Sequence, residues 1–226
     1  FFTCREDVGR DISALFNLLT GYSAPPKWEK LAVAPLGLRR HVVEEIDRAA
    51  EAASAGRAAR IVMKTNALID AETIRALVRA NRAGVEVILL VRGPCTLRVG
   101  QPGLTEGITV RTIVDRFLEH SRVFHFRIDE RDDVFITSTD VMPRNFDWRI
   151  EVMLPVEDEA LKRRIIDEIL GLELRDDTKA SVLQPDGTHR RPARAGDGFR
   201  AQGAFMELAR ARAHEDAAAG RGRRRR

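Results

Sequence analysis

Two hydrophobic periodicities alternate along the first half of the chain. Apolar residues recur at helical spacing in three segments: Asp7–Leu19, Leu38–Ala53 and the stretch that follows Asp70 and stops at Gly84. Short, nearly continuous apolar runs lie around these segments: Leu31–Ala34, Arg60–Lys64 and Val85–Val91. Helical spacing places apolar residues on one face of a helix, whereas a short apolar run between turn residues is typical of a buried strand. The alternation predicts a parallel sheet covered by helices.

The second half of the chain has the pattern of strands joined by hairpins. Three further strands are predicted: Arg122–Ile128, Val134–Ser138 and Arg149–Leu154. A run of charged residues, 129–133, separates the first two and predicts a turn. Helical spacing then returns over Glu159–Leu170, and a short helix is predicted near Asp177–Val182. The two halves together predict an α/β fold with a mixed sheet flanked by helices.

Composition indicates one globular domain followed by a polar extension. The chain has 226 residues, 44% hydrophobic and 32% charged, which suits a core over about 150 to 190 residues. Its two cysteines, Cys4 and Cys95, lack metal-ligand spacing, so neither a disulfide framework nor a zinc site is supported. No apolar run approaches the roughly 18 residues of a membrane span, and residues 5–7 are charged where a signal peptide is apolar. We therefore predict a cytoplasmic protein.

Positive charge is concentrated at the C-terminal end. Residues 191–226 contain ten arginines against four acidic residues, a surplus of six positive charges. Since the whole chain carries +4, the preceding residues carry a net charge of −2. A segment rich in Ala, Gly and Arg has few large apolar groups to bury, so the sequence predicts a disordered basic tail with room for a short helix near 204–214. Such a tail either contacts a polyanion or is a solvated extension.

A histidine, two arginines and several hydroxyl residues are concentrated in two short stretches. Phe117–Arg122 contains His120 and Arg122, and Ile136–Asn145 contains Arg144 beside a Thr-Ser-Thr run. Histidine can act as acid, base or nucleophile near neutral pH, while arginines and hydroxyls bind phosphate oxygens. The combination predicts half of a phosphoryl-transfer site on two neighbouring strands. The alternative is a partly exposed strand histidine between two solvated arginines.

Arg92 is a second candidate because of its place in the predicted sheet. It ends the apolar run Val85–Val91 and is followed by Gly-Pro, so it should emerge at the carboxyl edge of a central strand. Open α/β sheets bind their ligands at this edge, and a partly buried arginine there needs an anionic partner. Lys64 and Asn66 follow the preceding strand in the same way. Position and charge make them phosphate-binding candidates, with an ordinary strand end as the alternative.

Six separated blocks carry a resemblance to a known family. They are Phe2–Cys4 through Phe16–Tyr22, Leu31–Pro35, Val91–Cys95, Phe117–Arg122, Met142–Asn145 and Leu183–Gly187. In this order they resemble the C-terminal part of bacterial polyphosphate kinase of the first class, whose two C-terminal domains each resemble the phospholipase D fold. The resemblance implies a fragment with three parts: a connecting helix and linker, 1–27, a phospholipase D-like domain, 28–190, and the basic disordered tail, 191–226.

That family transfers the terminal phosphate of ATP reversibly to polyphosphate through a phosphohistidine. By resemblance, this chain is the ATP-binding and catalytic-support domain, and Arg92 and His120 match positions that contact ATP. We extend phosphate binding to Arg122 and Arg144 on chemical grounds, and to Asn145 as the neighbour of Arg144. The phosphorylated histidine would lie outside this chain, leaving His120 to act as a general acid or to orient ATP.

The resemblance also implies the cofactors and partners. ATP, ADP and polyphosphate are the expected substrates, and Mg²⁺ is expected with ligands outside this chain, with no metal site within it. The expected protein partners are upstream domains of the same polypeptide and further copies in a homo-oligomer. No specific nucleic acid is expected, although the basic tail could contact a membrane surface or another polyanion. The chain alone should fold without catalysing the reaction.

Two departures keep other functions open. His120 and Arg122 have the H-x-K spacing of phospholipase D-like enzymes, but arginine stands in place of lysine. Arg127 stands where that pattern has an aspartate, which argues against a self-sufficient phosphodiesterase. A phospholipase D-like phosphodiesterase with His120 as nucleophile is one alternative. A polyanion-binding module without chemistry, using Arg92, Arg144 and the tail, is the other.

Overall fold

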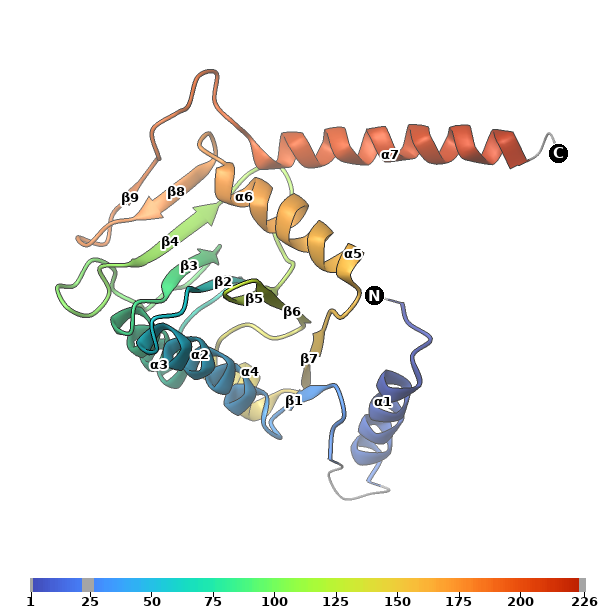
Figure 1. Ribbon diagram of the computed structural model, residues 1–226, viewed down its shortest axis with the longest axis horizontal. Coiled ribbons are helices and arrows are strands. Elements are labelled where there is room, and N and C mark those ends of the chain that lie inside the picture. The colour runs from blue at the N-terminus through green and yellow to red at the C-terminus, as the bar shows by residue number, and fades with distance from the viewer. Residues whose placement is uncertain (1, 22–26, 224–226) are drawn as a thin grey trace.

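The computed structural model describes residues 2–21 and 27–223, with 216–223 described by their backbone alone. Within these residues the strands form a nine-stranded sheet in the order β1-β7-β6-β5-β2-β3-β4-β8-β9 (Figure 1). The strands are β1 (Ala32–Ala34), β2 (Ala59–Thr65), β3 (Glu86–Val91), β4 (Ile108–Ile113), β5 (Val123–Ile128), β6 (Arg131–Thr137), β7 (Glu151–Pro155), β8 (Ala180–Leu183) and β9 (His189–Arg190).

The sheet is parallel at its centre and antiparallel on both sides. β3 runs parallel to β2 and to β4, so the carboxyl ends of these three strands reach the same edge. β5 lies antiparallel to β2, with Val123 opposite Lys64, and the remaining pairs are antiparallel as well. The predicted α/β fold with a mixed sheet flanked by helices is therefore confirmed.

Helices cover both faces of this sheet (Figure 1). The helices of the described chain are α1 (Glu6–Leu19), α2 (Leu38–Ser54), α3 (Ala71–Arg82), α4 (Pro143–Trp148), α5 (Glu159–Arg163), the π-helical η1 (Arg164–Leu170), α6 (Gly171–Arg175) and α7 (Ala201–Arg223). Buried residues of α2 and α3 pack with Ile61 and Met63 of β2, whereas η1 and α6 pack with Val62. Because successive strand residues point to opposite faces, Lys64 lies on the same face as Val62.

The predicted connecting helix is present as α1 and packs on the edge of the domain. Val8 and Leu15 of α1 lie in a cluster with Leu31, Val33 and Leu154. The buried carboxylate of Asp11 accepts hydrogen bonds from the backbone N–H groups of residues 29–31. These contacts attach α1 to β1 and β7. Residues 22–26 of the predicted linker lie outside the described residues.

Two predicted elements differ from the structure. The predicted helix near Asp177–Val182 is wrong, since Ala180–Leu183 is the strand β8, which pairs antiparallel with β4. The carboxylate of Asp176 accepts hydrogen bonds from three successive N–H groups, those of residues 178–180, and so fixes a turn into the strand. The helix predicted over Glu159–Leu170 continues through η1 and α6 as far as Arg175.

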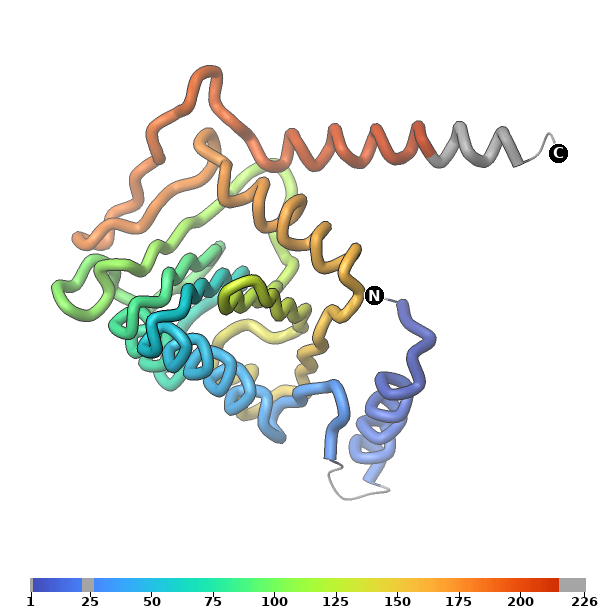
Figure 2. Tube along the Cα trace, in the orientation of Figure 1, coloured from blue at the N-terminus to red at the C-terminus, as the bar shows by residue number. Residues whose placement is uncertain are grey.

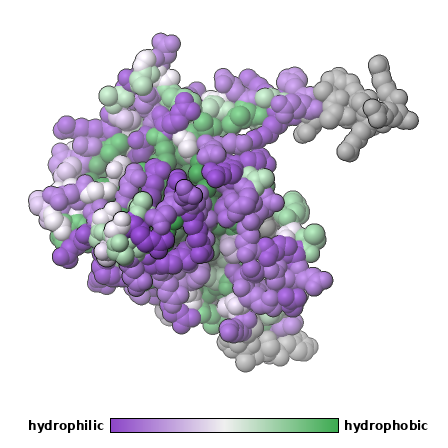
Figure 3. All heavy atoms as spheres, in the orientation of Figure 1, coloured by the Kyte–Doolittle hydropathy of each residue, from purple (hydrophilic) through white to green (hydrophobic). Residues whose placement is uncertain are grey.

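The boundary predicted at residue 191 also differs from the structure. The backbone N–H of Ala195 bonds to Asp177, residues 198–200 are partly buried, and Ala201 and Gln202 are buried at the start of α7. From there α7 runs away from the body of the molecule (Figure 2). Phe205 and Leu208 of α7 line a hollow of about 420 Å³ with residues of η1, and Figure 3 shows hydrophobic surface where α7 leaves the body. None of the described helices has the length and apolar character needed to cross a membrane.

Candidate functional site at the carboxyl edge of the sheet

Three loops are joined at the carboxyl ends of β2 and β3. Leu68 donates its N–H to the carbonyl of Pro94 at 2.9 Å, and its own carbonyl accepts from Thr96 at 3.0 Å. On the other side, Val141 donates to the carbonyl of Ala67 at 3.1 Å. The loop after β2 is thus bonded to the loop after β3 and to the loop after β6. Side chains from three separate parts of the sequence therefore meet at one edge of the sheet, where α/β folds bind ligands.

The carboxylate of Asp140 connects these loops. Arg122 donates two hydrogen bonds to it, from Nε at 2.8 Å and from Nη2 at 3.0 Å. Asn66 donates its backbone N–H at 2.8 Å and its Nδ2 at 3.0 Å to the same carboxylate. Partial burial raises the pKa of Asp140, but the bonds with Arg122 and Asn66 outweigh this and leave the pKa below its usual value. Asp140 is therefore an ionised group that holds Arg122 in a fixed orientation.

Arg92 is held at the same edge by a neutral partner. Its Nε donates to Oδ1 of Asn66 at 3.1 Å, and it forms no ion pair with any other described residue. The following residue must be glycine, since a Cβ on Gly93 would lie 2.8 Å from the carbonyl oxygen of Asn66. The half-buried guanidinium of Arg92 thus keeps both terminal nitrogens for an anion.

His120 lies beside Arg122 in a loop and not on a strand. The 114–122 loop joins β4 to β5, and the exposed His120 stands three residues before β5 begins. Arg122 donates from Nη1 to the carbonyl of His120 at 3.2 Å, and its Nη2 lies 3.5 Å from the imidazole Nε2. The predicted placement of both residues on one strand is wrong, because β5 starts only at Val123. The predicted pairing of His120 with Arg122 is present nonetheless.

Lys64, near the carboxyl end of β2, lies in a buried cluster of ionisable side chains with Glu119 and Glu173. Its Nζ donates to Oε2 of Glu119 at 2.8 Å and to Glu173 of α6, and its side chain is 5% exposed. Burial raises the pKa of Glu173 to about 7, although the Lys64 ammonium acts to lower it. Burial also raises the pKa of Glu119, but its bonds with Lys64 and Gln202 bring it below the usual value. Lys64 is therefore paired with two acidic side chains, and its role as a phosphate ligand stays a prediction.

Arg144 and Asn145 are neighbours in the chain, but Arg144 is exposed and Asn145 is buried. Arg144 is exposed in the first turn of α4 and has no side-chain hydrogen bond or ion pair with the described residues. Asn145 is buried, and its Nδ2 donates to Oε1 of Glu151 at 3.1 Å. Ser138 donates its hydroxyl to the other oxygen of Glu151. Asn145 of α4 and Ser138 of the loop after β6 are thus both bonded to Glu151 of β7, and of Arg144 and Asn145 the former alone is accessible to a ligand.

His125 has the structural role that its position suggests. It is buried on β5, and its Nε2 lies 2.7 Å from the Asp132 carboxylate. Burial lowers the pKa of His125, whereas Asp132 raises it, and the balance leaves the pKa below its usual value. His125 therefore joins the two strands of the β5–β6 hairpin, and the site contains one accessible histidine among the described residues, His120.

The sequence analysis missed four residues that organise the site. They are Asp140, Glu119, Glu173 and Gln202. Asp140 follows the Thr-Ser-Thr run and Glu119 precedes His120, so both lie within the stretches that were singled out. An acidic residue beside a cluster of cations was the signal available there. Glu173 and Gln202 lie far away in sequence and carry no such signal.

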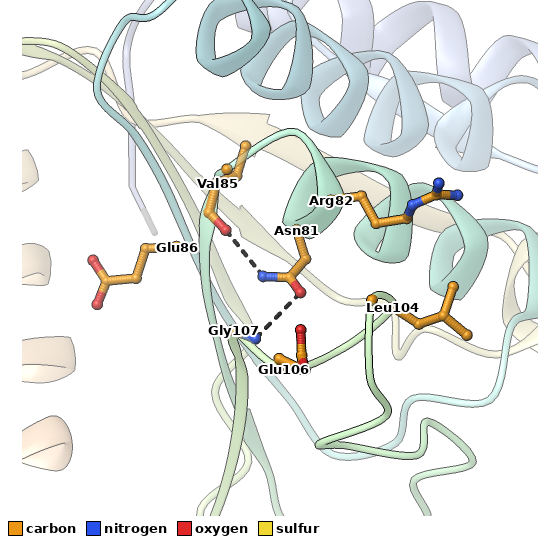
Figure 4. Close-up of a pocket in the computed structure, with 9 residues that line it drawn as sticks. Asn81, Arg82, Val85, Glu86, Leu104, Glu106 and Gly107 are labelled. Carbon is orange, nitrogen blue, oxygen red and sulfur yellow. Dashed lines mark hydrogen bonds between the residues drawn. The ribbon is translucent and has the colours of Figure 1, made fainter.

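A large open hollow lies at the amino end of β3, on the opposite edge of the sheet, and is not lined by the candidate site residues. It measures about 540 Å³ and is lined by residues at the end of α3 and around the start of β3 (Figure 4). Asn81 occupies it, donating to the carbonyl of Val85 at 3.4 Å and accepting from the N–H of Gly107 at 3.3 Å. The side-chain amide of Asn81 therefore links two backbone segments, at Val85 and at Gly107. The cluster of arginines and His120 lies at the other edge of the sheet.

The acidic side chains of the described residues form no cluster of three or more at the carboxyl edge of the sheet. No group of three or more His, Cys, Asp or Glu side chains among them is arranged to hold a metal ion. Asp140 is the carboxylate nearest in the hydrogen-bond network to Arg92 and His120, and its oxygens already accept from Arg122, Asn66 and Thr65. Mg²⁺ requires free carboxylate or phosphate oxygens.

The fold and the site define a class: an α/β domain with arginines and one histidine gathered at the carboxyl edge of its parallel strands. Residues 31–202 match the family model described as polyphosphate kinase C-terminal domain 2, and the chain belongs to this family. The polyphosphate kinase of Synechocystis sp. is 43% identical over 216 residues, covering 95% of this chain and 30% of the relative. The chain thus spans about a third of the length of such relatives.

Solved structures agree with the family. The polyphosphate kinase of Porphyromonas gingivalis superposes with a TM-score of 0.88 and 34% identity, over 93% of this chain and 32% of that protein. A phospholipase D family member, Nuc from Salmonella typhimurium, aligns over 61% of this chain and 89% of Nuc, with a TM-score of 0.44 and 19% identity. The second likeness is too distant to assign a function.

Proposed function

We propose that this chain is the ATP-binding and catalytic-support domain of a polyphosphate kinase. In the complete polypeptide it would act in the reversible transfer of the terminal phosphate of ATP to polyphosphate, through a phosphohistidine in another domain. The observation that carries the proposal is the gathering of Arg92, Arg122 and His120 around Asn66 and Asp140 at one edge of the sheet. The family membership of residues 31–202 supports it.

The contacts suggest a separate role for each cation. Arg92 has a neutral partner and two unengaged terminal nitrogens, so it binds the phosphates of ATP with two hydrogen bonds. Arg122 is bonded bidentately to Asp140, so its main role is to orient His120 through the carbonyl of that residue. Arg144 is exposed and unpaired among the described residues, and it adds positive charge toward the polyphosphate.

His120 acts in this scheme as the proton donor. As the bond between the terminal phosphorus of ATP and its bridging oxygen breaks, negative charge develops on that oxygen, and the imidazolium of His120 gives it a proton. Arg92 neutralises the remaining phosphate charge. ADP, polyphosphate, upstream domains of the same polypeptide, further copies in a homo-oligomer and a cytoplasmic location belong to the same proposal.

Replacement of His120 tests the proposal in a chimera that contains the missing domains. In this chimera the chain takes the place of the matching C-terminal part of the Synechocystis relative, which is 43% identical to it. Loss of one general acid lowers the rate by about 10² to 10⁴, so His120→Ala should lower polyphosphate synthesis by that factor. His214→Ala, which changes an exposed histidine on α7, is the control and should leave the rate unchanged.

Peptide mapping after labelling with γ-labelled ATP identifies the phosphorylated residue. We expect label on a peptide from the upstream domains both in the parent chimera and, more slowly formed, in His120→Ala. Label on the peptide that contains His120, and on none upstream, would reject the proposal in favour of a phospholipase D-like mechanism with His120 as nucleophile.

A further inference from the structure

The 114–122 loop has an unusual task in this fold. It starts at the carboxyl end of β4 and ends at Val123, which lies opposite Lys64 at the carboxyl end of β2. Since β3 lies between β4 and β2 in the sheet, the loop must cross the edge where Arg92 is placed. Three of its apolar side chains, Val114, Phe117 and Leu118, are exposed. Apolar packing therefore does not hold the loop in place, and polar contacts must do so.

Residues at the start of α7 supply some of these polar contacts. The buried side chain of Gln202 accepts from the N–H of Phe117 at 2.7 Å and donates to the carbonyl of the same residue at 2.8 Å. The same amide nitrogen donates to Oε1 of Glu119 at 2.6 Å. Arg200 donates two hydrogen bonds, at 2.7 and 2.6 Å, to Asp115, whose side chain is 3% exposed. Gln202 thus fixes both the backbone and a side chain immediately before His120.

Lys64, which is itself bonded to Glu173 of α6, holds the same loop through Glu119. Lys64 bonds the second oxygen of Glu119, Oε2, so the Glu119 carboxylate is fixed between Gln202 and Lys64. His120 is the next residue in the chain, and its carbonyl accepts from Arg122. With the Glu119 side chain and the His120 carbonyl both bonded, the backbone at His120 is held beside Arg122.

The segment that carries Gln202 is itself anchored. The carboxylate of Asp176 accepts from the N–H of Ala201 at 2.7 Å, and that of Asp177 accepts from the N–H of Ala195 at 2.8 Å. Arg175 stacks on the ring of Phe199, with its guanidinium carbon 4.3 Å from the ring centroid. These contacts place Gln202 on a rigid support, which a positioning residue needs.

We propose that Gln202 is a positioning residue for His120, because it holds the 114–122 loop over the carboxyl edge of the sheet through Phe117 and Glu119. This inference rests on the proposed function of His120 and extends it to a residue 82 positions later in the chain. It also assigns a role to the start of α7, which contributes no group to the edge where Arg92 and His120 meet.

Hydrogen exchange and kinetics together test the inference. Gln202→Ala should speed amide exchange in residues 115–120 of this chain by about tenfold or more, because the bond that protects the Phe117 N–H is lost. In the chimera the same variant should lower kcat about 10- to 100-fold while the KM for ATP changes less than about threefold, since displacement of a catalytic group by about 1 Å costs up to 10²-fold. The pattern of kcat against KM separates loss of positioning from loss of ATP binding.

Two further variants separate positioning from general packing. Arg212→Ala, on the same helix but bonded to Glu168, is the matched control and should change neither exchange in the loop nor kcat. Gln202→Glu keeps the size of the side chain but places a carboxylate beside Glu119, so its effect should exceed that of Gln202→Ala. If Gln202 only fills space, Gln202→Glu should instead be the milder change.

The outcomes distinguish this inference from the proposed function. Unchanged exchange in Gln202→Ala, or faster exchange without a fall in kcat in a chimera that His120→Ala impairs, overturns the inference alone. If His120→Ala leaves turnover of the chimera unchanged, the proposed function fails and the role of Gln202 fails with it.

Discussion

Two cations stand near the ends of neighbouring parallel strands and are held in opposite ways. Lys64 of β2 is buried between the carboxylates of Glu119 and Glu173. Arg92, directly after β3, is half-buried and bonded to the neutral side chain of Asn66. Both were candidates for phosphate binding because each follows an apolar strand. The structure separates them by the charge of their partners.

The difference shows which cations of an α/β edge are available to a ligand. A buried lysine between two carboxylates has its charge neutralised, and pulling it toward a phosphate would leave those carboxylates unpaired in the interior. An arginine held by an amide keeps its full charge, and its orientation is already fixed. Anion binding at Arg92 therefore needs no ion pair to be broken, whereas anion binding at Lys64 does.

The largest expected effect comes from removing the charge of Lys64. Lys64→Met leaves two carboxylates buried without a cation, and breaking a buried ion pair in this way costs about 3 to 5 kcal/mol of unfolding free energy. Urea unfolding measures the loss. Arg60→Met, on the same strand but in an exposed pair with Glu86, is the control and should cost less than about 1 kcal/mol.

A double variant sharpens this test. Adding Glu173→Gln to Lys64→Met removes one of the stranded carboxylates, so the double variant should be more stable than Lys64→Met alone. A loss in Lys64→Met no greater than in Arg60→Met would show that the cluster does not hold the fold, and the contrast with Arg92 would disappear.

The sequence predicts the frame of the fold because most elements are long and regular. The helices α1, α2 and α3 and the strands β2, β3 and β5 were located by periodicity. β4, with the sequence ITVRTI, was missed: it follows an irregular loop, 92–107, and its two partners in the sheet are β3, before that loop, and the distant β8. β8 was misread as a helix because four residues carry no clear period, and its pairing with β4 is a contact between distant segments.

The site was predictable as far as its residues follow strands or lie in one short stretch. Arg92, His120 and Arg122 were proposed by position, by chemistry and by the family resemblance, and in the structure they lie at one edge of the sheet, where their role stays a prediction. The partners that decide what each cation can do come from elsewhere in the chain. Glu173 from α6 bonds Lys64 across 109 positions, and a single sequence gives no indication of such a pair. The sequence therefore predicts where these cations lie, but it does not predict which of them are already paired with a carboxylate.

A second expected effect is a dependence of stability on pH that arises from Glu173. Burial raises its pKa from 4.5 to about 7. A carboxyl group with a higher pKa in the folded chain stabilises the fold while it is protonated, and this contribution is lost as pH rises from about 4.5 to about 7. Glu173→Gln lacks the titration, so it should gain stability relative to the parent chain over that range, by up to about 3 kcal/mol.

Urea unfolding at pH 5, 6, 7 and 8 measures this difference. Glu168→Gln is the control: Arg212 holds the pKa of Glu168 below its usual value, so its contribution has the opposite sign and is lost as pH falls. A stability difference between Glu173→Gln and the parent chain that stays constant from pH 5 to pH 8 would contradict a raised pKa of Glu173 in the folded chain.

The smallest expected effect concerns Arg92, the second cation of the comparison, when it is replaced by lysine. Arg92→Lys keeps the charge but loses the planar fork that binds two phosphate oxygens at once, so kcat/KM for ATP in the chimera should fall about tenfold, or about 1.4 kcal/mol. The melting temperature should change by less than about 2 °C, because the Arg92 side chain has a single hydrogen bond with the described residues, to Asn66, to lose. Arg98→Lys, an exposed arginine six residues later, should change neither quantity. A drop in melting temperature with kcat/KM preserved would mean that Arg92, like Lys64, is a structural cation whose charge the protein needs for itself.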